Sequence, residues 1–161
     1  MNTFTLNDAV ELATQRHEGQ VDKGGKPYIS HPLSVMAMLE DEQSKMAAVL
    51  HDIVEDTTVT FEELAELGCP KPVIDAVKLV THSKDFDGSD EAYVRDIQQI
   101  ATSSNQTAVD VKWADLTNNQ DLSRIPNPTA RDYARLERYG RAKVILRPLV
   151  SKYLLAFTDK P

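Results

Sequence analysis

The amino-acid sequence predicts an all-α fold, arranged as a compact multi-helix bundle. Apolar residues recur at helical spacing through most of the chain, and no stretch shows the sustained alternation of β-branched residues that is typical of strands. N-capping residues and prolines divide the chain into segments of ordinary helix length. We expect a single domain over residues 1–161, because a chain of this length is suited to one core.

Five helices are expected in the first half of the chain. The first has Thr5 or Asn7 as its N-cap, and glycines and a proline in the loop 19–28 break the chain after it. Pro32 suits the first turn of the second helix, and the segment 60–63 is a capping box that begins the fourth. The expected ranges are 6–18, 31–39, 43–54, 60–68 and 73–80.

Three more helices are expected in the second half. Residues 81–90 are polar and contain glycine, which predicts a loop. Pro126 and Pro128 break the chain before a long final helix, and Pro148 is expected to kink that helix. The expected ranges are 90–102, 105–122 and 129–158.

Composition excludes several classes of protein. Hydrophobic residues make up 41% and charged residues 27% of the chain, as in a soluble globular protein, and no apolar segment has the length that spans a bilayer. The first residues lack a basic start and an apolar stretch, so no secretory signal is expected. Cys69 is the only cysteine, which excludes an intrachain disulfide and a cysteine-rich zinc site. We therefore expect a cytoplasmic protein with no membrane partner.

The charge balance bears on the partners. A net charge of −7, from 25 acidic and 18 basic residues, argues against nucleic acid, because phosphate backbones are held by clustered Lys and Arg. A small anionic substrate is compatible with this charge where a metal ion and a local basic patch override it. The sequence does not determine the oligomeric state, so a homo-oligomer stays open.

An acidic cluster follows the apolar run 46–50. On a helix, His51, Asp52, Glu55 and Asp56 fall within an arc of roughly 140°, with apolar side chains on the other side. Three carboxylates on one face repel one another and are costly to desolvate, so a divalent cation is the natural partner of such a cluster. The sequence therefore predicts a metal site between helices.

Further ligands must come from distant parts of the chain. His31 lies at a junction between a loop and a helix, and Asp115 lies on an apolar-flanked helix with Asn119 one turn later. Two imidazoles and two carboxylates suit Mn²⁺, Zn²⁺ or Fe²⁺ better than Mg²⁺ or Ca²⁺, and Mn²⁺ is the first expectation. His17 is interpreted as a structural residue and His82 as a solvated one.

The joint pattern resembles the HD superfamily of metal-dependent phosphohydrolases. It is more closely similar to the small RelA/SpoT-type hydrolase domain, which removes the 3′-pyrophosphate from the alarmone (p)ppGpp. The resemblance covers about residues 6–122, and the final forty residues match weakly. The matching segments are 17–20, 23–33, 47–57, 80–81 and 111–115, with Asn119.

The resemblance implies a role for each matching residue. Glu55 and Asp56 are implied to act beyond the metal shell, where they orient or deprotonate the attacking water. Lys23, Lys112 and Asn119 occupy substrate-binding positions of the family. Our own reading of the residues adds Tyr28 as a hydrogen-bonding partner of the sugar or base, and Lys26 as a second cation for the phosphates. The implied metal ligands are His31, His51, Asp52 and Asp115.

Two segments depart from the family pattern. Asp22 stands where the family has the arginine that stacks on guanine, and a carboxylate makes no cation–π contact and repels phosphate. Residues 116–119 read Leu-Thr-Asn-Asn where the family has Arg-Leu-His-Asn. Both changes leave the hydrolytic centre intact and leave the identity of the base open.

The sequence thus favours a metal-dependent phosphohydrolase that acts on a nucleotide, with hydrolysis of a (p)ppGpp-type 3′-pyrophosphate as the most specific expectation. Alternatives are another nucleotide phosphatase, acting on a nucleoside monophosphate or a dinucleotide 2′-phosphate, and a nucleotide-binding regulator without catalysis. A pure binder has no need of six residues of the hydrolytic centre, which favours an enzyme. Synthesis of the alarmone is not expected, because the chain has no room for a synthetase module.

Overall fold

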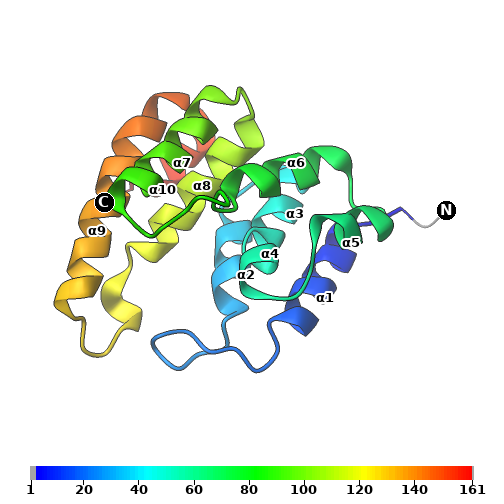
Figure 1. The fold of residues 1–161 in the computed structure, drawn as a ribbon, viewed down its shortest axis with the longest axis horizontal. Coiled ribbons are helices and arrows are strands. Elements are labelled where there is room, and N and C mark those ends of the chain that lie inside the picture. Colours follow the sequence, from blue (N-terminus) through cyan, green and yellow to red (C-terminus); the bar gives the residue numbers. More distant parts are fainter. Residues whose placement is uncertain (1–2, 161) are drawn as a thin grey trace.

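The computed structural model describes residues 3–160, and helices dominate this part of the chain (Figure 1). Extended pairing within it is limited to one isolated bridge, between Val21 and Pro27, so the predicted all-α class is confirmed. The helices are α1 Leu6–Arg16, α2 Ser30–Ala37, α3 Glu42–Leu50, α4 Ile53–Asp56, α5 Phe61–Glu66, α6 Lys71–Val80, α7 Asp90–Thr102, α8 Gln106–Asn119, the 3₁₀ helix η1 Leu122–Arg124, α9 Ala130–Leu146, the 3₁₀ helix η2 Arg147–Leu149 and α10 Lys152–Thr158.

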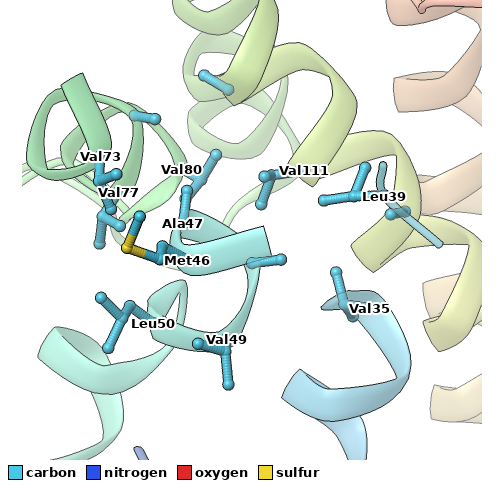
Figure 2. Close-up of a cluster of buried hydrophobic side chains, with 14 of the residues drawn as sticks. Val35, Leu39, Met46, Ala47, Val49, Leu50, Val73, Val77, Val80 and Val111 are labelled. Atoms are coloured by element: carbon cyan, nitrogen blue, oxygen red, sulfur yellow. The ribbon is translucent and has the colours of Figure 1, made fainter. Parts of the chain in front are cut away.

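The short helix α3 lies at the centre of the bundle. It packs against α1, α2, α6 and α8, and every residue from Met46 to Leu50 is buried. Figure 2 shows this core, in which Met46 and Leu50 of α3 lie near Val73 and Val77 of α6. Burial of a side chain such as Leu50 contributes about 1.5–3 kcal/mol. The apolar run thus holds the end of α3 in place, directly before His51.

The C-terminal helices form the other side of the molecule. In Figure 1, α9 runs along one edge of the bundle, and it packs against α7 and α8. Asp132 closes its first turn in a capping box with Thr129. This position lets α9 form a wall beside the loop 19–28, although the two segments are far apart in the sequence.

Several expected boundaries are confirmed, and the expected final helix is wrong. Helices α6 and α7 lie where they were expected, and Thr5 is the N-cap of α1. The expected single helix over 129–158 is instead three elements, because the chain breaks at Pro148 rather than bending there. Proline has no N–H to continue the helix and its ring clashes with the preceding turn. Within residues 3–160, every helix is too short or too polar to span a bilayer.

Candidate metal centre

Three separate segments bring four donor atoms together. His31 lies in the first turn of α2, His51 and Asp52 lie between α3 and α4, and Asp115 lies on α8. The His51 Nε2 atom is 3.0 Å from Asp52 Oδ2, and His31 Nε2 is 3.2 Å from Asp115 Oδ1. The two Nε2 atoms are 3.3 Å apart. The structure therefore gathers the four side chains that the sequence analysis predicts as ligands.

A break in the backbone allows neighbouring residues to converge. The single helix expected over 43–54 is wrong, since α3 ends at Leu50 and α4 begins at Ile53. Adjacent residues of a regular helix point about 100° apart, which would separate His51 from Asp52. The last turn instead tightens, with the His51 N–H directed at Ala48 O at 3.4 Å, and Asp52 lies at φ −100° and ψ −2°. The break turns both side chains toward one point.

Each imidazole is oriented by a partner on its other nitrogen. His51 Nδ1 donates to the Ala48 carbonyl oxygen at 2.6 Å, and His31 Nδ1 donates to Asn118 Oδ1 at 2.7 Å. Because a carbonyl oxygen only accepts, Nδ1 carries the hydrogen and the Nε2 lone pair faces the cluster. Sequence reasoning missed Asn118. The signal that was present is its position three residues after Asp115 on the same helix.

The donor set fits a divalent cation. Two Nε2 lone pairs and two carboxylate oxygens, all acceptors, face one another in a largely buried space, which is unfavourable without a positive charge among them. Metal–ligand bonds of about 2.0–2.2 Å place neighbouring ligand atoms roughly 3.0–3.5 Å apart. The distances around the cluster lie between 3.0 and 3.5 Å. His31, His51 and Asp52 are therefore spaced as ligands of one ion, and Asp115 Oδ1 lies within 3.5 Å of both imidazoles.

The pKa shifts within the cluster also favour a bound cation. Burial disfavours the imidazolium of His51, yet the Asp52 and Asp115 carboxylates outweigh burial and hold the pKa of His51 well above its usual value. Burial also opposes ionisation of Asp115, but Lys112 and the two imidazoles hold its pKa well below the usual value. The carboxylates thus stay ionised and draw positive charge into the centre.

Three predicted substrate-binding residues contact the carboxylates of this cluster. The Tyr28 hydroxyl donates to Asp52 Oδ2 at 2.5 Å, and burial followed by the Asp52 charge raises the pKa of that tyrosine. The Lys112 ammonium donates to Asp115 Oδ2 at 2.9 Å, and the Asn119 amide donates to Asp115 Oδ1 at 2.7 Å. Their hydrogen bonds therefore orient the candidate ligands, although all three also line the adjacent cavity.

The fourth predicted substrate-binding residue, Lys23, lies farther out. It lines the cavity, and its ammonium pairs with Asp132 at the start of α9. Asp22, its neighbour, accepts hydrogen bonds from the backbone N–H groups of Gly24 and Lys26 at 2.8 and 2.9 Å. Asp22 thus builds the loop, and the Lys23 ion pair connects this loop to α9.

A cavity of about 560 Å³ opens beside the cluster. Its walls come from the loop 19–28, α4, the segment 80–93, α8, η1 and α9. Glu55 and Asp56 of α4 line it together with His31, Asp52 and Asp115. Burial raises the pKa of Glu55 and of Asp56, and the Asp52 charge adds to both effects. Two carboxyl groups with raised pKa values thus face the cavity next to the cluster.

The cationic side chains of the cavity differ in whether they already pair with another group of the chain. Lys23 and Lys112 are paired with carboxylates, and Arg138 pairs with Asp90 at 2.7 Å. Arg124 donates to the backbone oxygen of Asn118 at 3.0 Å. Arg135 of α9 lines the cavity and makes no ion pair within residues 3–160. It is therefore the arginine best placed to receive an anion.

Removal and return of the metal should change stability. We expect Mn²⁺ or Zn²⁺, added to chelated protein at about 100 times its dissociation constant, to stabilise the fold by about 2.7 kcal/mol. For a chain of this size that corresponds to a rise in melting temperature of roughly 5–10 °C. Thermal denaturation followed by circular dichroism measures it. An unchanged melting temperature with Mn²⁺, Zn²⁺ and Fe²⁺ would contradict a metal centre.

The hydrogen bond to Asn118 gives a graded test. Asn118→Ala should weaken metal affinity by about 10- to 100-fold, because the His31 ring loses the partner that sets its orientation. Asn118→Asp keeps an acceptor oxygen on Nδ1 and should restore most of the affinity. Titration with a metal-sensitive dye compares the two variants, and equal affinities for the wild type and Asn118→Ala would refute this role.

Comparisons with known proteins agree with the geometry. The family model described as HD domain matches residues 9–135, from α1 into α9. The guanosine-3′,5′-bis(diphosphate) 3′-pyrophosphohydrolase of Haemophilus influenzae is 35% identical over 116 residues, which are 67% of this chain and 17% of that protein. The bifunctional (p)ppGpp synthase/hydrolase SpoT of Escherichia coli is 41% identical over 66 residues, which are 38% of this chain and 9% of that protein. The chain spans less than a fifth of the length of these curated relatives.

The fold is also similar to a solved structure. A metazoan orthologue of SpoT, described as hydrolysing ppGpp and playing a role in starvation responses, superposes with a TM-score of 0.80 at 27% sequence identity. The match covers 96% of this chain and 92% of that one. It therefore extends through the C-terminal helices, where the sequence resemblance is weak. Since the family model covers most of the helices and all four candidate ligands, the chain belongs to the HD domain family.

Proposed function

We propose that this chain is a metal-dependent phosphohydrolase that removes the 3′-pyrophosphate of a (p)ppGpp-like nucleotide, with Mn²⁺ as its metal and the cytoplasm as its location. The observation that carries the proposal is the convergence of two imidazole and two carboxylate donors beside a cavity that also holds Glu55 and Asp56. The named activities of the relatives and of the similar solved structure support the choice of nucleotide.

The chemistry follows from the charges around the cavity. A divalent cation held by His31, His51, Asp52 and Asp115 would lower the pKa of a bound water and polarise a phosphoryl oxygen. Glu55 and Asp56 lie next to this cluster as carboxyl groups with raised pKa values. A base with a raised pKa holds an abstracted proton more firmly, which suits it to take the proton of an attacking water. Their role is therefore general base catalysis and orientation of the water.

The cavity also suits a nucleotide in size and charge. Its volume of about 560 Å³ lies within the range of small-molecule sites, roughly 300–1,000 Å³. Arg135 is placed to contact a phosphate, while Lys23 and Lys112 lower the negative charge of the walls through their ion pairs. Tyr28 and Asn119 line the cavity and keep acceptor oxygens for the sugar or base.

The loop 19–28 favours a second candidate, a phosphatase for a nucleotide with a different base. Asp22 lines the cavity where the family pattern has an arginine, and its carboxylate accepts two backbone N–H groups. This side chain provides no cation for stacking on guanine. Hydrolysis of a nucleoside monophosphate or a dinucleotide 2′-phosphate is the corresponding activity.

A substrate panel tests the proposal. The purified full chain is analysed for bound metal and then assayed with Mn²⁺, Zn²⁺ or Fe²⁺ on ppGpp, a nucleoside monophosphate and a dinucleotide 2′-phosphate. Release of pyrophosphate from ppGpp, highest with Mn²⁺, is the expected result. Release of phosphate from one of the other two substrates alone would establish the second candidate. Binding of ppGpp without any turnover would overturn both and indicate a regulator.

A further inference from the structure

His82 occupies a position on the cavity wall that the sequence does not suggest. The interpretation of His82 as a solvated residue leaves out its contacts, because its side chain is 29% exposed and also lines the cavity. Its backbone N–H donates to Glu55 Oε1 at 2.5 Å. His82 is therefore next to the carboxylate that we propose as the base.

The imidazole of His82 is held from two directions. Its Nδ1 atom is 2.9 Å from Asp96 Oδ2 of α7, and its ring stacks on Phe86 with centroids 3.7 Å apart and planes 1° from parallel. A carboxylate on Nδ1 fixes the tautomer and stabilises the imidazolium. Nε2 makes no hydrogen bond to the part of the chain that the structure describes. It is the ring nitrogen that remains for a ligand.

Unpaired polar atoms surround this imidazole. Asp96 Oδ1, Ser83 Oγ and Tyr93 Oη are buried and have no hydrogen-bond partner within residues 3–160. The Tyr93 ring centroid is 6.0 Å from that of His82, and Tyr93 lines the same cavity. Native structures leave few such groups without a partner, and a cluster of them beside a cavity needs a functional explanation.

We infer that His82, held by Asp96, contacts the substrate by donating its Nε2–H to a phosphate oxygen in the cavity. The inference rests on the proposed function and adds a specificity-determining contact to it. Lys23, Lys112 and Arg138 are already in ion pairs, and Arg124 donates to the Asn118 backbone oxygen. His82 Nε2 is thus, with Arg135, among the groups of the cavity wall that are left to contact a phosphate. Asp96 acts through His82 and is a positioning residue.

Four variants test the contact, with inorganic pyrophosphate as the probe and the Mn²⁺-loaded full chain as the protein. His82→Ala should weaken pyrophosphate binding by about 10- to 100-fold, the loss expected for a hydrogen bond to a charged group. His82→Gln keeps a donor near the position of Nε2 and should recover part of that loss, whereas a stacking role would not be rescued by glutamine. Asp96→Asn should weaken binding less than His82→Ala. Lys84→Gln, which removes a cation from an exposed position of the same loop, should leave binding unchanged.

Calorimetry measures the binding, and steady-state kinetics on the hydrolysed substrate give KM and kcat separately. A rise in KM that follows the loss of pyrophosphate affinity, with unchanged metal content and melting temperature, supports the contact. If the wild type hydrolyses its substrate and His82→Ala keeps both KM and pyrophosphate affinity, the inference is overturned and the proposed function stands. If nothing is hydrolysed but pyrophosphate binding depends on His82, the proposed function fails and the contact stands. If neither is observed, both fail.

Discussion

His51→Ala should abolish turnover and remove the bound metal. The variant lacks one of four candidate ligands and leaves Asp52 and Asp115 without the imidazole between them. Loss of a residue that only orients a ligand costs roughly 10- to 100-fold in activity, and the rate of hydrolysis should fall by well over this. Elemental analysis of the purified variant and the pyrophosphate-release assay measure the two effects. Both should be lost together, because the same side chain serves both.

A second histidine provides the matched control. His17 is also buried, and it pairs with Gln20 at 2.8 Å outside the cluster. His17→Ala should keep its metal, even where its melting temperature falls. Full metal content and full turnover in His51→Ala would eliminate the assigned centre, whatever the substrate.

Glu55→Gln should keep the metal and lose the reaction. Glutamine is nearly isosteric and still accepts the His82 N–H through its amide oxygen, but it cannot take a proton from water. We expect kcat to fall by about 10²- to 10⁴-fold, the usual contribution of a general base, with little change in metal content. Single-turnover measurements at saturating Mn²⁺ separate this loss from any change in product release.

An exposed glutamate on the next helix serves as the control for this change. Glu66→Gln removes the same charge at the end of α5, outside the cavity, and should leave kcat unaffected. A Glu55→Gln variant with more than about a tenth of wild-type kcat would assign the base to another group. Asp56 is the first alternative, because it lies on the same short helix and also has a raised pKa.

The sequence predicted which residues form the candidate metal site better than it predicted the backbone that carries them. Two histidines and two aspartates were selected by type and order, and the structure brings them together. The helical arc expected for the segment 43–54 was wrong, because the chain breaks at His51. The break comes at the end of a helix that packs against four others, and periodicity contains no information on such tertiary contacts.

The sequence could not predict the ion pairs of the expected cations. Lys23 and Lys112 line the cavity as expected, but each is also paired in the folded chain, with Asp132 and Asp115 respectively. The Lys23 partner is 109 residues away along the chain. His82 was dismissed because its partner, Asp96, belongs to the next helix, α7. Single-sequence reasoning selects side chains by type, while their availability is decided by contacts across the fold.

The ion pair between Lys112 and Asp115 has a consequence for the order of events at the centre. The Asp52 and Asp115 carboxylates exceed the single buried ammonium by one charge, and the raised pKa of His51 shows that they draw a proton onto that imidazole to balance it. A divalent ion in place of that proton makes the centre more positive and therefore more attractive to an anionic nucleotide. We therefore expect that metal must bind before the nucleotide can bind, and not only before it is cleaved. Removal of the metal by a chelator should then weaken the affinity of the protein for the nucleotide.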